Sequence, residues 1–376
     1  MNQQLEFQAD RIEAVLALNK VPARVTGGTV TPRWVRFQVL PAVGTEMSRI
    51  KSLSEEMAAA LDVSNCRVSR RGAAVAVEVP RDDPQPVRLL PLYDQLTNQL
   101  PDQPPITAIL GLTDDGAPLL IRLPSPDVGH VLVAGETGSG KTVLLQTMIL
   151  SLAMTNAPTD LTLILIDPKG HAFRLFEELP HMARPVIWQV AEVTEVLESL
   201  VRLMERRGDP TGSLKPVGSV VVVIDELADL LTNDTEIASA LVKLTQRGRE
   251  AGIHIVAATQ KPTAAVLGPL IKANFPVRLV GRVTSVADAR TATGWSGTGV
   301  ERLTGRGDFV AVAEGRVIRF QVAHVSPAEI RDVVTMTRTA RMTGMFRGGE
   351  NEQDYISSNS SCRNSDGIGR HRQPVE

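Results

Sequence analysis

Four short apolar runs divide the middle of the chain, and each ends in glycine or polar residues. They are HVLVAG at 130–135, LTLILIDP at 161–168, SVVVVIDE at 219–226 and IHIVAATQ at 253–260. Nearly continuous apolar runs of this length are typical of strands buried on both faces, as in a parallel sheet covered by helices. Because such strands alternate here with helical patterns, residues 101–330 are predicted to form an α/β domain with a mostly parallel sheet.

The pattern before this domain is different. Apolar residues recur at helical spacing in QADRIEAVLALN (8–19) and MSRIKSLSEEMAAALD (47–62), whereas RWVRFQVLP (33–41) and GAAVAVEVP (72–80) read as strands. The proline-rich stretches RDDPQP and LPDQPP follow. Residues 1–100 are therefore predicted to be a small α+β domain and its linker. Residues 331–376 are polar and are predicted to form a disordered tail.

Composition narrows the classes of function. The 376 residues are 43% hydrophobic and 22% charged, which is an ordinary globular balance. Aromatic residues make up only 3%, so a platform that stacks single-stranded bases, as in a strand-separating helicase, is disfavoured. The net charge is -2, so any contact with nucleic acid must come from a local basic patch.

The cysteine content and the length of the apolar stretches indicate the cellular compartment. Cys66 and Cys362 are too few and too far apart for a disulfide framework or a zinc site, which fits the cytoplasm. The polar start of the chain is no signal peptide, and no apolar stretch reaches the roughly 20 residues that span a bilayer. We therefore expect no direct membrane insertion, and work at a membrane would require a membrane-bound recruiting protein.

The first apolar run leads into GETGSGKT, which matches the phosphate-binding pattern G-x-x-x-x-G-K-[ST] between a strand and a helix. Its residues, the predicted ATP-binding set, are Gly135, Glu136, Thr137, Gly138, Ser139, Gly140, Lys141 and Thr142. Glycines let backbone N–H groups cradle phosphate oxygens, the lysine reaches the β- and γ-phosphates, and Thr142 is predicted to ligate Mg²⁺.

Polar residues follow the other apolar runs, at the strand ends where ligands of parallel sheets bind. Asp225 is predicted to hold Mg²⁺, and Glu226 to polarise the attacking water; the alternative is an acidic pair that caps a helix. Gln260 is predicted to sense the γ-phosphate, or else is a surface glutamine. The segment 167–170 (DPKG) is either part of the site or only a tight turn.

Several segments together resemble the FtsK/SpoIIIE family of DNA translocases. They are IDPKG, IDELADLL, GREAGIHIVAATQKP and LIKANFPVRLVGRV, and the resemblance covers roughly residues 106–325. It implies a RecA-like P-loop NTPase motor, usually a hexameric homo-oligomer, that moves along double-stranded DNA. It also implies that a neighbouring subunit contributes an arginine to the γ-phosphate. Arg249 matches that arginine, with Arg247 as the near alternative; a solvated basic helix end is the other interpretation.

The resemblance also implies DNA contacts from loops that face the pore. By their motifs these fall on Lys261, Lys272 and Arg290, although each could be an ordinary surface charge. A motor that moves along any sequence should contact phosphates rather than bases. The family's membrane region and winged-helix domain are not visible, so a compact relative from a plasmid, phage or integrative element is expected.

Three functions are therefore open. The first is a cytoplasmic, ATP-driven translocase of duplex DNA, as in chromosome partition. The second is a conjugative coupling ATPase that hands DNA to a secretion channel. The third is a nucleotide-binding interaction protein with a regulatory ATPase, which the complete set of Lys141, Thr142, Asp225 and Glu226 disfavours.

Overall fold

The structure is a computed structural model that describes residues 2–99, 104–208, 218–233, 235–260, 262 and 274–342. The chain divides into two compact units. The first contains residues Met1–Val87 and Leu112–Ala117, and the second contains Arg88–Gly111 and Pro118–Glu376. Among the described residues, none of the helices combines the length and the apolar character needed to cross a membrane.

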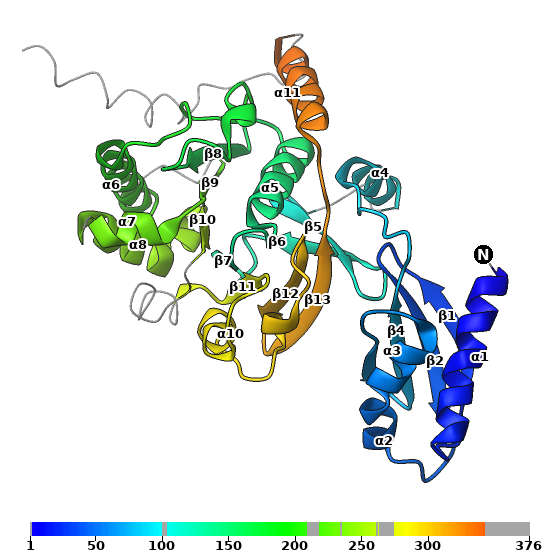
Figure 1. The fold of residues 1–376 in the computed structure, drawn as a ribbon. Coiled ribbons are helices and arrows are strands. Elements are labelled where there is room, and N and C mark those ends of the chain that lie inside the picture. Colours follow the sequence, from blue (N-terminus) through cyan, green and yellow to red (C-terminus); the bar gives the residue numbers. More distant parts are fainter. Residues whose placement is uncertain are drawn as a thin grey trace, which may run out of the picture. The chain divides into compact units, whose positions relative to one another are not determined.

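The first unit is a four-stranded sheet in the order β1-β2-β4-β3, packed against helices (Figure 1). Its elements are α1 (Asn2–Leu18), β1 (Ala23–Val30), β2 (Trp34–Pro41), α2 (Met47–Ser52), α3 (Ser54–Leu61), β3 (Arg67–Arg71) and β4 (Ala74–Pro80). This confirms the predicted small α+β domain. The predicted helix over 47–62 is two helices that meet at Leu53, a buried residue. Strand β1 was not predicted, because its centre is a pair of glycines.

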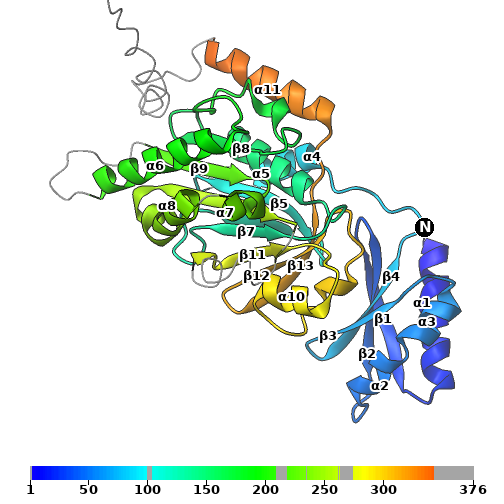
Figure 2. The same cartoon turned by 60° about the vertical axis from the view of Figure 1, so that its left-hand side comes forward.

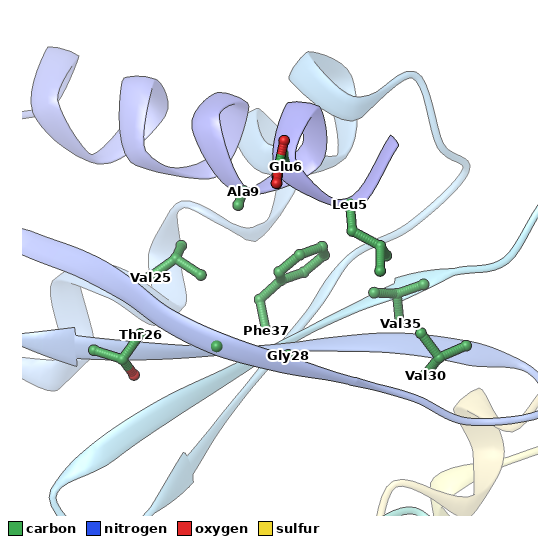
Figure 3. Close-up of a pocket in the computed structure, with 10 residues that line it drawn as sticks. Leu5, Glu6, Ala9, Val25, Thr26, Gly28, Val30, Val35 and Phe37 are labelled. Atoms are coloured by element: carbon green, nitrogen blue, oxygen red, sulfur yellow. The ribbon is translucent and has the colours of Figure 1, made fainter. Parts of the chain in front are cut away.

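An apolar hollow lies between α1 and strands β1 and β2 (Figure 3). Gly28 keeps it open, because a Cβ atom there would lie 3.6 Å from the ring of Phe37 and 3.1 Å from the carbonyl oxygen of Arg36. The lining contains one titratable side chain, Glu6, and no pair of acidic and basic groups.

The second unit is built on a nine-stranded sheet in the order β6-β5-β13-β12-β11-β7-β10-β9-β8. Its strands are β5 (Thr107–Thr113), β6 (Pro118–Arg122), β7 (Val131–Ala134), β8 (Leu161–Ile166), β9 (Ser219–Ile224), β10 (Ile253–Thr259), β11 (Val277–Val280), β12 (Asp308–Ala313) and β13 (Arg316–Val322). Strands β11, β7, β10, β9 and β8 pair in parallel, whereas β12 pairs antiparallel with β11 and β13. The four predicted strands and the α/β class are confirmed, and the sheet as a whole is mixed.

Helices cover this sheet. They are α4 (Leu89–Gln99), α5 (Lys141–Thr155), α6 (Val190–Arg207), α7 (Leu227–Asn233), α8 (Thr235–Arg247), α10 (Val286–Thr293) and α11 (Pro327–Met342), with short 3₁₀ turns at Arg174–Phe176, Gly248–Ala251 and Val300–Arg302. Alternate residues of the parallel strands form one apolar core with α6 and α8, which lie side by side (Figure 2). Helix α5 packs against α4, α11 and β13 instead.

Two predicted boundaries differ from the structure. Helix α4 belongs to the second unit rather than to the N-terminal domain, because its apolar face is buried and Tyr93 donates a hydrogen bond to the carbonyl oxygen of Met154 (3.1 Å). The prediction of disorder from residue 331 is wrong as far as Met342, since α11 covers that stretch. The segment Ser326–Glu329 is a capping box: Ser326 N–H donates to the Glu329 carboxylate (2.7 Å) and Glu329 N–H to the Ser326 hydroxyl (3.2 Å). The rest of the predicted tail lies outside the described residues.

Candidate active site

The phosphate-binding motif connects β7 to α5, in the context that the sequence predicts. All three glycines of the motif have positive φ angles, and at two of them the surrounding atoms leave no room for a side chain. A Cβ atom on Gly135 (φ 153°) would lie 2.8 Å from the Ser139 hydroxyl, and one on Gly140 (φ 106°) would lie 2.7 Å from the backbone nitrogen of Gly307. Any side chain at either position would therefore push the loop open.

Lys141 is the first residue of α5, and its side chain is buried over the loop. Its Nζ donates hydrogen bonds to the carbonyl oxygens of Gly135 (2.7 Å) and Glu136 (3.3 Å). Burial lowers the pKa of the Lys141 ammonium, and the carboxylates of Glu226 and Asp225 act in the opposite direction. These charges place Lys141 beside the two acidic residues that the sequence assigned to the same site.

A turn from a distant part of the sequence supports the loop from outside. Arg306 N–H donates to the carbonyl oxygen of Gly138 (3.0 Å), and Gly307 N–H donates to that of Ser139 (2.7 Å). Arg306 itself has a positive φ of 52°. These two bonds satisfy the carbonyl oxygens of Gly138 and Ser139. The N–H groups of Gly135, Glu136 and Ser139 donate to backbone carbonyl oxygens, so a phosphate would be met by the other N–H groups of the motif.

Glu136 is the one acidic residue in the motif, and it forms an ion pair with Arg282 beyond the end of β11. The two residues are joined a second time, because Glu136 N–H donates to the carbonyl oxygen of Arg282 (2.9 Å). The guanidinium neutralises a carboxylate that would otherwise repel phosphate. The motif includes Glu136, but nothing local in the sequence indicates Arg282, because the pairing depends on β11 lying next to β7 in the sheet.

The segment after β8 is a tight turn whose lysine side chain contacts Glu226. Asp167 is fully buried, and its carboxylate accepts hydrogen bonds from the N–H groups of Lys169 (3.1 Å), Gly170 (2.9 Å) and Ala172 (2.6 Å). This geometry directs the Lys169 ammonium to Glu226, at 3.6 Å. The segment is therefore a tight turn, and its contact with Glu226 favours the interpretation that it belongs to the site.

Asp225 follows β9 and is largely buried. Burial, together with the charge of Asp167, raises the pKa of the Asp225 carboxyl to about 6, while Lys141 acts in the opposite direction. A carboxylate that is costly to ionise where it lies is stabilised by a nearby cation.

The donor set fits Mg²⁺. The carboxylate of Asp225 and the hydroxyl of Thr142 are oxygen ligands of the kind that Mg²⁺ prefers, and Thr142 is adjacent to Lys141 at the start of α5. In the described ranges no group of three or more His, Cys, Asp or Glu side chains could hold a metal. The two residues would therefore share the ion with phosphate oxygens and water, as Mg²⁺ commonly requires.

Glu226 is nearly inaccessible, at 3% exposed, and its carboxylate is held from two sides. Gln260 N–H donates to both of its oxygens, at 3.1 and 3.2 Å, and Lys169 lies on the other side. Glu226 directly precedes α7, which begins at Leu227, so it occupies a position from which a side chain could cap that helix. Its carboxylate instead contacts Gln260 at the end of β10. For Glu226 the contacts therefore favour a role in the site over helix capping.

Gln260 connects this acid to the phosphate loop. Its backbone contacts Glu226, and its side-chain Oε1 accepts a hydrogen bond from the Thr137 hydroxyl (3.1 Å). The structure thus brings Lys141, Asp225, Glu226 and Gln260 together at the carboxyl ends of β7, β9 and β10.

Replacing Asp225 by asparagine is expected to stabilise the nucleotide-free protein by about 1–3 kcal/mol at pH 7.5, because the pKa of about 6 makes ionisation of Asp225 unfavourable in the fold. The pKa of Asp225 in the folded protein lies above the ordinary value of 3.8. Its ionisation therefore lowers the free energy of unfolding of the wild type fully above about pH 6, and not below about pH 4. Thermal denaturation should show the difference between the proteins shrinking from pH 7.5 to pH 4. Asp332→Asn, an exposed carboxylate on α11, is the control; an equal gain there would contradict the assignment.

Arg249 lies at the opposite edge of the sheet, in the 3₁₀ turn before β10. Its Nη1 donates to the carbonyl oxygen of Pro126 (2.7 Å), and its side chain is 37% exposed. Strand β10 separates it from Gln260 by about 20 Å. The structure therefore does not bring Arg249 to the phosphate loop of its own subunit. Arg247, the alternative, is exposed at the end of α8.

Of the three predicted DNA contacts, only Arg290 lies in the described residues. It is exposed near the end of α10, a helix that Ser285 caps by accepting a hydrogen bond from Asp288 N–H (3.1 Å). Lys261 and Lys272 lie outside the described residues. Lys261 directly follows Gln260 in the sequence.

Comparison with known proteins gives a consistent result. A model of the FtsK/SpoIIIE family matches residues 92–211 and 209–264, and a model of the FtsK alpha domain matches residues 1–81. A DNA translocase FtsK of Staphylococcus epidermidis is 31% identical over 386 residues, which covers 95% of this chain and 47% of that protein. One from Bacillus cereus is 32% identical and covers 89% of this chain and 45% of that protein. The chain thus spans about half the length of these curated relatives.

Solved structures agree on the fold. The pCW3 conjugation coupling protein TcpA, determined as a monomer with ATPγS, superposes with a TM-score of 0.58 at 19% identity, over 88% of this chain and 99% of that chain. The cytoplasmic domain of the type VII secretion ATPase EccC of Thermomonospora curvata gives 0.57 at 25% identity, over 63% of this chain and 32% of that chain. The second unit therefore has the fold of a P-loop ATPase motor.

Proposed function

The chain belongs to the FtsK/SpoIIIE family and carries a P-loop ATPase domain, and we propose that it acts as a ring, of six subunits, that moves along double-stranded DNA. The observation that carries this proposal is the position of Arg249. It lies about 20 Å along β10 from the phosphate-side residue Gln260, so it can meet a γ-phosphate only if that phosphate is bound by another subunit. A ring supplies such a neighbour at every site.

The nucleotide site follows from the described contacts. Phosphate oxygens would take the N–H groups of the loop, and the Lys141 ammonium would exchange the carbonyl oxygens of Gly135 and Glu136 for the β- and γ-phosphates. Asp225 and Thr142 would hold Mg²⁺, which neutralises phosphate charge when bound. Glu226, oriented by Gln260 and Lys169, would accept the proton of the attacking water.

Movement along DNA requires that ATP hydrolysis at the nucleotide site change the position of the residues that contact DNA. Gln260 contacts both Glu226 and Thr137, and the next residue is Lys261. We propose that Lys261, Lys272 and Arg290 contact DNA phosphates, so that binding is independent of sequence and weakens as salt rises. Relatives at 31–32% identity that are named DNA translocases support DNA as the partner.

A conjugative coupling ATPase is the second candidate. The similarity to TcpA extends over most of both chains but at 19% identity, so it supports the fold and leaves the cargo open. Both candidates would use the same nucleotide site. They differ in the protein that recruits the ring, such as a membrane-bound partner, and in where the DNA is delivered.

ATP turnover with and without linear duplex DNA tests the proposal. Duplex should raise turnover at least tenfold, because a motor hydrolyses ATP rapidly only when it has a track, and the effect should fall between 50 and 200 mM salt. Lys141→Ala should show no turnover in either condition, which sets the background. Equal turnover with and without duplex would favour the regulatory ATPase instead.

A further inference from the structure

Two buried histidines lie at the edge of the sheet that carries Arg249, away from the phosphate loop. His130 immediately precedes β7 and is 3% exposed, and His254 is the second residue of β10 and is 1% exposed. Neither has a part in the phosphate chemistry described above. Burial lowers the pKa of His130 to about 3 and that of His254 to about 4, so both rings are neutral at physiological pH.

The two rings exchange hydrogen bonds with each other's backbone neighbours. Ile255 N–H donates to Nδ1 of His130 (3.0 Å), and Nδ1 of His254 donates to the carbonyl oxygen of Gly129 (3.0 Å). A backbone N–H only donates and a carbonyl only accepts, so His130 carries its proton on Nε2 and His254 carries its proton on Nδ1. We call this reciprocal pair, His130 and His254 with their two bonds, the histidine clasp.

The clasp joins the backbone segments that contact Arg249. Its Nη1 donates to the carbonyl oxygen of Pro126 (2.7 Å). Its aliphatic chain lies against Gly129, where a Cβ atom would be 3.4 Å from the arginine Cδ. Gly129 is the residue whose carbonyl His254 holds. On the other side, Gly248 packs against the His130 ring, since a Cβ atom there would be 3.7 Å from Cε1 of His130.

Stability alone does not explain the two rings. The Nε2 atoms of His130 and His254 are buried, and neither has a hydrogen-bond partner among the described residues. Burying an unpaired polar atom costs free energy that an apolar side chain of similar volume would not. The polar bonds made by Nδ1 therefore serve the geometry of the segments they join, namely residues 125–130 and 247–255.

We propose that His130 and His254 are positioning residues, which hold the segment under Arg249 so that its guanidinium points out of its own subunit toward the phosphate site of the next. This inference rests on the proposed function, in which Arg249 acts in trans. An arginine on a loosely held segment would find the γ-phosphate less often, and a displacement of about 1 Å can cost about 10²-fold in rate. The clasp supplies rigidity without touching the nucleotide.

Mixed rings separate this role from ordinary support of the fold. Lys141→Ala subunits, the donors, bind no nucleotide of their own but can supply Arg249 to a neighbour. Arg249→Ala subunits, the acceptors, can bind ATP but cannot supply the arginine. Turnover in the mixture therefore reports donation alone. His254→Leu in the donor subunit should lower that turnover about 10- to 100-fold. The same substitution in the acceptor subunit should lower it less than about threefold.

Two further variants of the donor subunit test the hydrogen bond between His254 and the carbonyl oxygen of Gly129. His254→Asn keeps an N–H group in place of Nδ1, so it should retain most of the turnover that His254→Leu loses. His181→Leu is the control. His181 is equally buried, but it contacts the carbonyl oxygen of Asn156 (2.9 Å) and belongs to neither segment of the clasp, so turnover should not change.

Each outcome decides the question. If His254→Leu lowers turnover equally in the donor and in the acceptor subunit, its role is structural and the proposal is overturned. The same holds if the His254→Leu subunit fails to fold. Full turnover with the His254→Leu donor would overturn it as well. If the parental mixture itself gives no turnover although mixed rings form, the trans role of Arg249 is wrong and the clasp falls with it.

Discussion

Replacing Glu226 by glutamine is expected to lower the rate of ATP hydrolysis by about 10²- to 10⁴-fold while ATP still binds. Glutamine has nearly the same shape, and its side-chain oxygen can still accept the hydrogen bond from Gln260 N–H. It cannot take a proton from water at neutral pH. The variant should therefore hold ATP unhydrolysed, which single-turnover experiments with labelled ATP would show.

The matched control is Asp229→Asn. Asp229 lies 3.6 Å from the Lys169 ammonium, the same distance as Glu226, but it is half exposed. If Glu226 acts as the base, Asp229→Asn should retain most of the turnover. Equal losses in both variants would show that the ion pairs of Lys169, rather than proton transfer to Glu226, account for the effect.

Removal of Arg249 has the second large effect. Arg249→Ala should lower turnover by about 10³- to 10⁵-fold, because an arginine that neutralises transition-state charge is worth that much in related phosphoryl transfers. Mixing these subunits with Lys141→Ala subunits should restore activity. In random rings about a quarter of the interfaces pair an intact phosphate site with an intact arginine, which sets the upper limit of the recovery.

Two controls make the mixing experiment decisive. Arg247→Ala removes the neighbouring exposed arginine of α8 and should retain most of the activity, unless Arg247 is the arginine that acts. Co-purification of differently tagged subunits must show that mixed rings form. Restoration by Arg247→Ala in the place of Arg249→Ala would transfer the role to Arg247.

The sequence predicted four of the five parallel strands because their signal is local. Each of the four apolar runs is buried on both faces and ends at the site, as in SVVVVIDE. The antiparallel half was not foreseen, since β12 and β13 alternate less clearly and acquire their places only by pairing with β11. Helix α11 was missed although its capping box, Ser326–Glu329, is visible in the sequence. Its few buried residues were outweighed by polar ones.

The candidate site shows the same limit. The motif identified Lys141, and the strand ends identified Asp225, Glu226 and Gln260, because each lies beside an apolar run. The ion pair of Arg282 with Glu136 depends on strand order, and the support from Arg306 depends on a turn that lies far along the chain. The histidine clasp was overlooked because a histidine beside a strand carries no signal until its partner is known.

Displacement of a third DNA strand tests the central claim most directly, that ATP hydrolysis between subunits moves this protein along duplex DNA. A linear duplex carries a bound triplex-forming oligonucleotide, and its release is followed over time with ATP and Mg²⁺. The account predicts that the wild type releases the oligonucleotide, and that Glu226→Gln does not although it binds ATP. An oligonucleotide that stays bound while the wild type hydrolyses ATP on the same duplex would contradict it.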